Sequence, residues 1–419
     1  MRTFRVPSTD GVVLEVQVHE PEQNEPPTRP AGGVQGAVQV SGGEHSAGER
    51  PAASTVLLAH ANGFHGRVFD PAVEALMRAG RSAGIARVVT FDFRAHGGST
   101  SPALGSREDT MAAPIPGEAS TSDSSLPGGS DGRSDRSVAL SEWENRASSF
   151  RRRLRWATFA EDVLAVVSGL RLEGCVAVGH SLGAHALLRA ASIRPGTFAS
   201  VYCFEPIFVV PRSRLPPGAA PANLEKGAAR RRRSFASKAA AHAALGSKPP
   251  LSAVHPAAMR AYVEHGFLFD GDSESYGSTS RSRDGTWHSG KVHLACAPEA
   301  EAAIFANGGE EHTALAEVSG AGGTTPGLEA ITPRRRGVGC PITVAHGALT
   351  DPRQPGVVLY SSAIAPVIAA DLGGGAALEH LPQLDHFGPL VDPEAFAASV
   401  LRHWVRHHGG GVGRERSRL

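Results

Sequence analysis

Short apolar runs alternate with segments of helical spacing along most of the chain. The apolar runs are bounded by polar or turn residues and predict buried strands at 54–61, 87–93, 175–179, 200–209, 341–347 and 377–383. Segments with helical spacing of apolar residues lie between or after them, at 71–81, 156–172, 182–192 and 392–404. Near-continuous apolar strands are typical of parallel sheets covered on both faces. The pattern therefore predicts an α/β fold with a mostly parallel central sheet and helices on both of its faces.

Four long segments break this alternation because they are rich in Pro, Gly, Ser, Gln or Asp and poor in apolar residues. They cover residues 21–53, 99–150, 271–290 and 307–338. Such segments bury too little apolar surface to offset the entropy lost on ordering. We expect them to be disordered insertions in a single domain.

Charge and cysteine content exclude several classes of function. Lys and Arg total 42 against 41 Asp and Glu, so the net charge of +1 creates no overall field that attracts nucleic acid or an anionic membrane. There is no signal-peptide pattern and no run of 18 apolar residues, so we expect no membrane span. None of the four cysteines belongs to a C-x-x-C pair, and we expect free thiols and no bound metal. These cysteines are Cys175, Cys203, Cys296 and Cys340.

The stretch GHSLG at 179–183 matches G-x-S-x-G and places Ser181 between an apolar strand and an apolar helix. This strand–turn–helix setting is the one that a nucleophile elbow requires. A serine on so sharp a turn needs small residues two positions before and after it, and Gly179 and Gly183 meet that need. A second match, GGSDG at 128–132, has neither a strand nor a helix beside it, so we discard it.

Four further motifs follow the predicted strands in a familiar order. They are HANGFHGRVF at 60–69, DFRAHGGST at 92–100, HGALTDP at 346–352 and LDHFGPLVDPEAF at 384–396. With the elbow, they resemble the oxyanion loop, the D-x-R-G-H-G-x-S segment, the acid loop and the histidine loop of the α/β-hydrolase fold. The chain is thus similar to large, capped, single-domain members of that family. Ala61 and Ala95 stand where glycine is common.

This resemblance implies a catalytic triad with Ser181 as nucleophile, His386 as general base and Asp351 as the acid. Glu205, at the end of an earlier strand, is the alternative acid. The resemblance also assigns the oxyanion hole to the backbone N–H groups of Asn62 and Leu182. Other polar residues of these motifs are interpreted as structural, namely His60, His96, His180 and Asp385.

The function implied is a serine hydrolase that cleaves a carboxylic ester or thioester of a small or medium organic substrate through an acyl-enzyme. It needs neither a metal nor an organic cofactor. Two alternatives keep the fold: cleavage of another bond, such as a carbon–carbon bond, on the same triad, and a binding protein without catalysis. Epoxide and haloalkane hydrolases of this fold use an aspartate nucleophile, so Ser181 argues against them.

The resemblance also divides the chain. Residues 1–209 and 339–405 are expected to form the catalytic core, 210–338 the cap and 406–419 a flexible tail. Within the cap we expect helical pieces at 225–245 and 255–269, and a strand followed by a helix at 292–305. The arginine run at 230–233 is interpreted as a solvated helix face, with binding of a substrate carboxylate or phosphate as the alternative.

The last three residues are Ser417, Arg418 and Leu419, after a glycine-rich stretch. This ending is a conservative variant of the S-K-L peroxisomal address. The sequence therefore predicts recognition by a peroxisomal import receptor, with a cytoplasmic location as the alternative.

Overall fold

The computed structural model describes residues 1–20, 54–102, 148–219, 223–270, 289–308, 338–350, 358–372 and 376–408. The four predicted disordered insertions fall almost entirely outside these ranges. Asp351 and the C-terminal Ser417, Arg418 and Leu419 also lie outside the described residues. The expectations for all of these segments therefore stay predictions.

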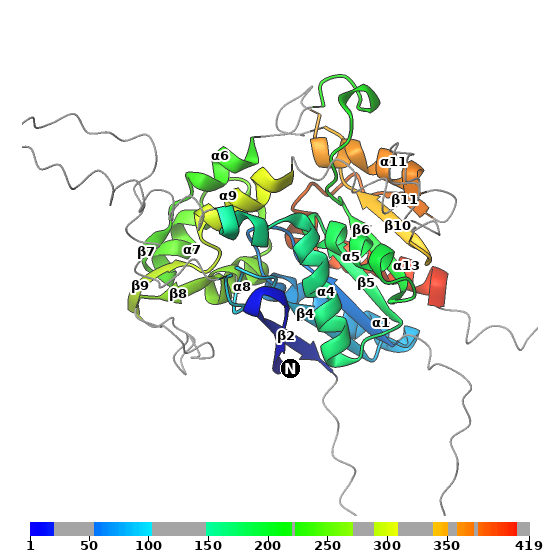
Figure 1. Ribbon diagram of the computed structural model, residues 1–419, viewed down its shortest axis with the longest axis horizontal. Coiled ribbons are helices and arrows are strands. Elements are labelled where there is room, and N and C mark those ends of the chain that lie inside the picture. The colour runs from blue at the N-terminus through cyan, green and yellow to red at the C-terminus, as the bar shows by residue number, and fades with distance from the viewer. Residues whose placement is uncertain are drawn as a thin grey trace, which may run out of the picture.

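Eight strands form one sheet in the order β1-β2-β4-β3-β5-β6-β10-β11 (Figure 1). The six strands from β4 to β11 in this order pair in parallel, whereas β1 pairs with β2, and β2 with β4, in antiparallel fashion. The mostly parallel sheet and its six predicted strands are thus confirmed. The strands are β1 (Arg2–Pro7), β2 (Val13–His19), β3 (Thr55–Ala59), β4 (Arg87–Phe91), β5 (Cys175–His180), β6 (Phe198–Phe204), β10 (Ile342–His346) and β11 (Ala376–His380).

Successive residues of the central strands point to opposite faces of the sheet, so each face has its own apolar core. In β3, Val56 and Leu58 pack into the core under α1 and α13, while Leu57 and Ala59 pack into the core under α4, α5 and α11. Helices α4 and α5 lie in front of the sheet in Figure 1. The helices are α1 (Asp70–Gly80), α4 (Trp156–Leu170), α5 (Leu182–Ile193), α11 (Tyr360–Leu372) and α13 (Pro393–His408). Helices on both faces confirm the predicted architecture; α11 was not predicted.

The N-terminal β1–β2 hairpin, which the apolar pattern did not single out, is tied to the rest of the molecule by a buried ion pair. Arg94 follows β4, and its Nε and Nη2 atoms donate to the carboxylate of Asp162 in α4 at 2.9 and 2.7 Å. Both side chains are fully buried. The same guanidinium donates to Thr9 and Asp10 in the hairpin turn, at 2.8 and 3.2 Å. Arg94 thus joins three separate segments of the chain.

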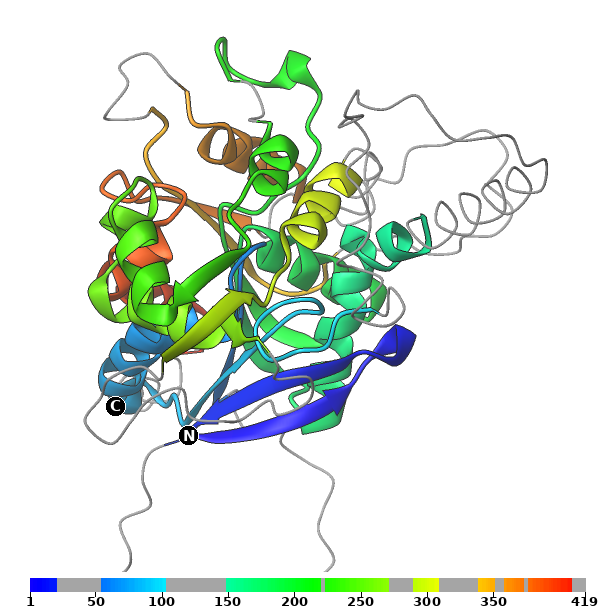
Figure 2. The same ribbon diagram turned by 90° about the vertical axis from the view of Figure 1, so that its left-hand side faces the viewer.

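Between β6 and β10 lies a second, smaller sheet of three antiparallel strands in the order β7-β9-β8. We call residues 223–270 and 289–308, which contain this sheet and four helices, the insertion. Figures 1 and 2 show it as one group beside the large sheet. Its elements are α6 (Leu224–Ala229), β7 (Ser234–Ser237), α7 (Lys238–Gly246), α8 (Pro256–Gly266), β8 (Phe267–Phe269), β9 (Ser289–Leu294) and α9 (Pro298–Asn307).

The strand and helix expected at 292–305 are confirmed as β9 and α9. The helical region expected at 225–245 is divided into α6 and α7 by strand β7. Phe235 of β7 pairs with Val292 of β9, and the Ser237 side chain accepts the Ala240 N–H at 3.1 Å, which starts α7 as an N-cap. The interpretation of 230–233 as a helix face is therefore wrong, because these arginines connect α6 to β7.

All four cysteines are free, and three of them are buried. In the part of the chain that the structure describes, no helix combines the length and the apolar character needed to cross a bilayer.

Candidate active site

Ser181 occupies a strained turn between β5 and α5. Its φ of 55° and ψ of −114° are unusual for a residue with a side chain. A Cβ atom on Gly179 would lie 2.5 Å from the backbone of Ala184, and one on Gly183 would lie 2.2 Å from the Ala59 carbonyl oxygen. Neither approach is sterically tolerable, so the predicted need for small residues around the serine is confirmed. The turn has the geometry of a nucleophile elbow.

The register of the sheet places Glu205 beside Ser181. His180 at the end of β5 pairs with Phe204 at the end of β6, and each is followed directly by one of the two residues. The Ser181 N–H donates to the Phe204 carbonyl at 3.0 Å. Glu205 itself has a φ of 45°, which turns the chain sharply at the end of its strand.

The buried carboxylate of Glu205 holds the imidazole of His386. Its Oε2 accepts a hydrogen bond from His386 Nδ1 at 2.7 Å, and its Oε1 accepts the Gly347 N–H at 2.9 Å and the Ser362 hydroxyl. Burial alone would raise the pKa of Glu205, but the bonds from His386, Ser361 and Ser362 lower it to about 2. The ionised carboxylate can only accept, so Nδ1 carries the hydrogen and Nε2 is left as a base.

The second carboxyl next to the histidine has a local role. Asp385 Oδ1 accepts the Phe387 N–H at 2.8 Å, which agrees with the structural role expected for Asp385 from the sequence. Asp351, the acid expected from the sequence, lies outside the described residues. The carboxylate that contacts His386 in the structure belongs to Glu205, the alternative acid.

His180 links the elbow to the histidine loop. Its Nε2 donates to the His386 carbonyl at 2.7 Å, and the two rings are 5.0 Å apart. Its Nδ1 is buried and has no hydrogen-bond partner within the described residues. Burial, and then the nearby His386, lower the pKa of His180 to about 3, so the ring stays neutral. His180 thus fixes the backbone of the base without titrating near neutral pH.

The loop after β3 lies on the other side of the elbow. Asn62 is buried there, and Gly63 has a φ of 79° that favours glycine. The Gly63 N–H donates to His96 Nε2 at 3.0 Å. Leu182 is the first residue of α5, where backbone N–H groups have no partner within the helix. The two expected oxyanion donors, Asn62 and Leu182, therefore come from this loop and from the helix that follows Ser181.

His60 and His96 support this loop as hydrogen-bonding residues. His60 Nε2 accepts the Phe93 N–H at 3.0 Å, and its Nδ1 donates to the Ala61 carbonyl at 2.7 Å. His96 Nδ1 donates to the Arg94 carbonyl at 2.8 Å. Burial lowers the pKa of His60 well below its usual value and that of His96 to about 4. Both rings are neutral, which agrees with the structural role expected from the sequence.

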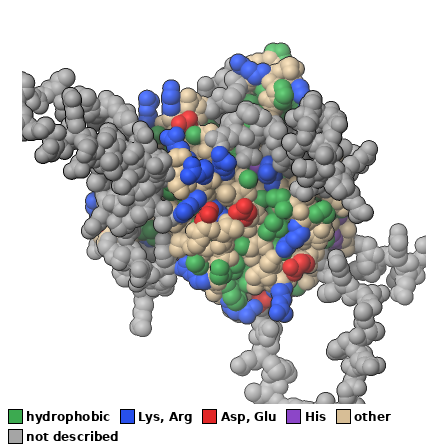
Figure 3. Space-filling view, in the orientation of Figure 1, with side chains coloured by type: hydrophobic (Ala, Val, Ile, Leu, Met, Phe, Trp, Pro, Cys, Tyr) green, Lys and Arg blue, Asp and Glu red, His purple; other side chains and the backbone are tan. Residues whose placement is uncertain are grey.

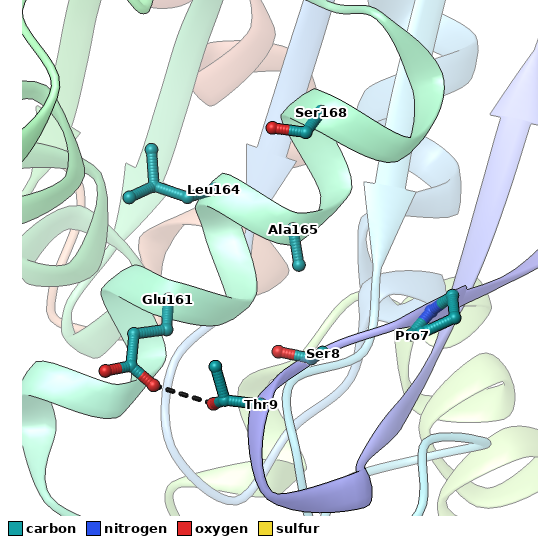
Figure 4. A pocket seen from close by; sticks show the side chains of 7 residues that line it. All are labelled: Pro7, Ser8, Thr9, Glu161, Leu164, Ala165 and Ser168. Carbon is teal, nitrogen blue, oxygen red and sulfur yellow. Dashed lines mark hydrogen bonds between the residues drawn. The ribbon is translucent and has the colours of Figure 1, made fainter.

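A shallow hollow on the surface lies between the hairpin turn and α4 (Figure 4). Thr9 Oγ1 donates to Glu161 across it at 2.6 Å. None of the candidate catalytic residues lines it. Its lining residues are Pro7, Ser8, Thr9, Glu161, Leu164, Ala165 and Ser168. We assign it no catalytic role.

Within the described ranges, no group of three or more His, Cys, Asp or Glu side chains is arranged to hold a metal ion.

The sequence model of the alpha/beta hydrolase family matches residues 56–399. The match spans well over half of the chain, so this protein belongs to the alpha/beta hydrolase family and is classed as a hydrolase. A comparison with curated protein sequences found no match.

Solved structures share the fold at low sequence identity. The peroxisomal alpha-beta-hydrolase Lpx1 from Saccharomyces cerevisiae has a TM-score of 0.54 and 12% identity, with 97% of this chain and 87% of that chain covered. E-2-(acetamidomethylene)succinate hydrolase has a TM-score of 0.51 and 14% identity, covering 96% and 98%. The thioesterase domain from the curacin biosynthetic pathway has a TM-score of 0.50 and 12% identity, covering 96% and 99%.

Proposed function

We propose that this protein is a serine hydrolase that cleaves a carboxylic ester or thioester of a small or medium organic substrate. The triad is Ser181, His386 and Glu205. The observation that carries the proposal is the bond from His386 Nδ1 to the buried Glu205, next to a serine on a strained elbow. A serine hydroxyl is a weak nucleophile until a base takes its proton, and this arrangement supplies that base.

The reaction proceeds through an acyl-enzyme. Ser181 Oγ attacks the carbonyl carbon of the substrate while His386 Nε2 accepts the hydroxyl proton. The N–H groups of Asn62 and Leu182 donate to the oxyanion that forms. Collapse of this intermediate breaks the ester or thioester bond, and His386 gives its proton to the departing alcohol or thiol. Water then repeats the sequence on the acyl-enzyme, which releases the acid and restores Ser181.

Glu205 acts on this cycle through the imidazole. Its negative charge stabilises the imidazolium that forms when His386 accepts a proton, and its Oε2 keeps the ring in the required tautomer. Because the pKa of Glu205 is lowered to about 2, the carboxylate remains charged throughout the neutral range.

The insertion is proposed to act as the cap of the site. It contacts the loop after β3 through ring pairs: Phe64 and Tyr262 are 5.3 Å apart, and His65 stacks on Tyr262 at 6.1 Å. The insertion also contacts the segment that follows His386, since the backbone N–H of His255 donates to the Leu390 carbonyl at 2.9 Å. These contacts support a cap that bounds the substrate space from both sides of the elbow.

A panel of p-nitrophenyl esters of increasing acyl chain length tests the proposed reaction. The wild-type protein should hydrolyse a subset of the panel, and Ser181→Ala should reduce kcat by about 10⁴-fold or more because the nucleophile is gone. Unchanged circular dichroism serves as the folding control. An active Ser181→Ala variant would contradict the role of Ser181. A folded wild-type protein that cleaves no ester or thioester would instead favour carbon–carbon cleavage or a binding protein.

We further propose the peroxisome as the location of this protein. The ending Ser417, Arg418 and Leu419 supports it as a variant of the S-K-L address, read by an import receptor. A structural neighbour of the same fold is described as a peroxisomal hydrolase, at 12% identity.

A further inference from the structure

The side chains of the arginine run at 230–233 make different contacts. Arg232 stacks over the ring of Phe235 at 4.4 Å, and Arg233 pairs with Glu299 at the first turn of α9. Figure 3 shows Lys and Arg side chains gathered on the face of the molecule over α6 and α9. Arg231 differs from its neighbours because both of its hydrogen-bond partners, Glu301 and Tyr262, are buried.

Arg231, in the connection between α6 and β7, bonds to two helices of the insertion. Its Nη1 donates to the carboxylate of Glu301 in α9, and its Nη2 donates to the hydroxyl of Tyr262 in α8. The Glu301 side chain is 9% exposed, and Tyr262 is buried. A carboxylate so far removed from water needs a paired charge, and Arg231 supplies it. Its guanidinium is therefore already neutralised, which argues against the alternative use of this arginine for a substrate anion.

The ion pair lies directly against the loop that carries a proposed oxyanion donor. A Cβ atom on Gly63 would lie 2.7 Å from Glu301 Oε1 and 3.3 Å from Arg231 Nη1. The side-chain amide of Asn62 donates to the Glu301 backbone carbonyl at 3.2 Å. Glu301 thus contacts both residues of this turn, and Arg231 holds Glu301 in place.

The opposite side of the same turn is fixed by the core of the protein. The Gly63 N–H donates to His96 Nε2 at 3.0 Å, and His96 Nδ1 is in turn bonded to the Arg94 carbonyl. The Asn62–Gly63 turn is therefore held between His96 of the core and Glu301 of the insertion. Removing the insertion side would leave the turn supported from one side alone.

We propose that Arg231 is a positioning residue for the oxyanion hole. Through Glu301 it keeps the Asn62–Gly63 turn in the geometry in which the Asn62 N–H faces the reacting carbonyl. This inference rests on the proposed hydrolase function for its kinetic consequence. Residues of both the core and the insertion then hold the oxyanion hole in place.

Arg231→Met tests this role, with Arg233→Met as the matched control. Both variants remove an arginine that pairs with a glutamate of α9, but only Arg231 lies against Gly63. Arg231→Met should lower kcat on the best p-nitrophenyl ester by about 10- to 100-fold with little change in KM, because misplaced catalytic groups cost rate at this scale. Arg233→Met should leave both constants near the wild-type values. Equal kcat values for the two variants would overturn the proposal.

The double variant Arg231→Met/Glu301→Met covers the case in which the single variant does not fold. It removes both members of the pair, so no unpaired charge is buried. If Arg231 supports the turn, kcat stays low in the double variant. Recovery of the wild-type kcat would show that the pair matters only as a neutralised charge, and would overturn the proposal.

Hydrogen exchange separates this inference from the proposed function. In peptides covering residues 60–66, backbone amides should exchange faster in the double variant than in Arg233→Met, whether or not the protein turns over an ester. Unchanged exchange would overturn the role of Arg231 by itself. A wild-type protein without hydrolase activity would count against the proposed function alone, and the exchange result would still decide the role of Arg231.

Discussion

Two of the residues proposed to take part in the chemistry have a strained backbone. Ser181 and Glu205 are both non-glycine residues with positive φ, and they end neighbouring strands. Such conformations cost about 1–3 kcal/mol each and persist only where the surrounding structure determines them. Here the parallel pairing of β5 with β6 and the close packing around Gly179 and Gly183 impose them. The strain aims both side chains at the edge of the sheet where His386 lies.

The identity of the triad acid gives a sharp prediction at this scale. Glu205→Gln should lower kcat by about 10³- to 10⁴-fold, because a neutral amide cannot stabilise the imidazolium and can favour the wrong tautomer of His386. Asp351→Asn, a substitution of the same kind, should leave kcat near the wild-type value. Steady-state kinetics on one good ester compares the two.

The reverse result would return the acid role to Asp351. A kcat that falls only in Asp351→Asn, with Glu205→Gln folded and active, contradicts the assignment made from the contact with His386.

The sequence predicts the same nucleophile and base that are proposed from the structure, whereas it favours Asp351 over Glu205 as the acid. Ser181 lies between an apolar strand and an apolar helix, with a glycine two positions before it and another two positions after it. His386 lies shortly before an apolar segment that forms a helix. The choice of acid depends on which strand ends nearest to His386. The order of the strands in the sheet determines this, and the sequence does not give that order directly. A weak signal was present, since Glu205 directly follows an apolar strand. Only the pairing of β6 between β5 and β10 brings it next to the histidine.

At the scale of elements, the β1–β2 hairpin depends on the Arg94–Asp162 pair. Asp162 also accepts the Ser8 hydroxyl at 2.6 Å, so the hairpin turn, the loop after β4 and helix α4 meet at one buried site. Breaking a buried pair by removing one partner leaves an uncompensated charge in the interior. The Arg94 guanidinium therefore contributes to the stability of this edge of the sheet, beside the backbone pairing of β2 with β4.

Arg94→Met should reduce the free energy of unfolding by about 3–5 kcal/mol. The control is Arg78→Met, which breaks an ion pair with Glu394 whose side chains are 63% and 69% exposed, and which should cost about 1 kcal/mol or less. The midpoints of urea unfolding curves measure both. Equal midpoints for the two variants would contradict the structural role of Arg94.

The strands that are buried on both faces could be predicted from their apolar residues alone. Prediction failed where strand pairing or a helix cap determines which element forms. The six core strands are apolar enough to be recognised one by one. Strand β7 is short and polar, and its pairing with the distant β9 overrides the helical composition of the surrounding residues. The β1–β2 hairpin has a signal in the sequence, because the buried Leu14, Val16 and Val18 alternate with polar residues along β2.

At the scale of the whole molecule, the fold assembles a site from segments far apart in the chain. The carboxyl ends of the parallel strands lie at one edge of the sheet. Each proposed site residue comes after a different strand, and these residues are Asn62, Ser181, Glu205 and His386. The insertion closes on the same edge through Tyr262. The order of the motifs along the sequence predicts that the elbow, the oxyanion loop and the histidine loop lie at one edge of the sheet, but it assigns the acid to Asp351 and not to Glu205.

The proposed location is tested on residues 1–419. A fluorescent protein fused to the N-terminus leaves Leu419 free, and in a eukaryotic cell the fusion should appear in peroxisomes. Deleting Ser417, Arg418 and Leu419 should return it to the cytoplasm, because the import receptor reads the free C-terminal tripeptide. An unchanged cytoplasmic distribution of both fusions would contradict a peroxisomal address.

The most direct test of the central claim is covalent labelling with a fluorophosphonate, followed by mass spectrometry of the digested protein. An activated serine should form an adduct that maps to Ser181, and Ser181→Ala should remove it while remaining folded. Glu205→Gln should slow adduct formation, since His386 then loses its charged partner. Folded wild-type protein that forms no adduct, or an adduct on another serine, would contradict the assignment of Ser181 as the nucleophile.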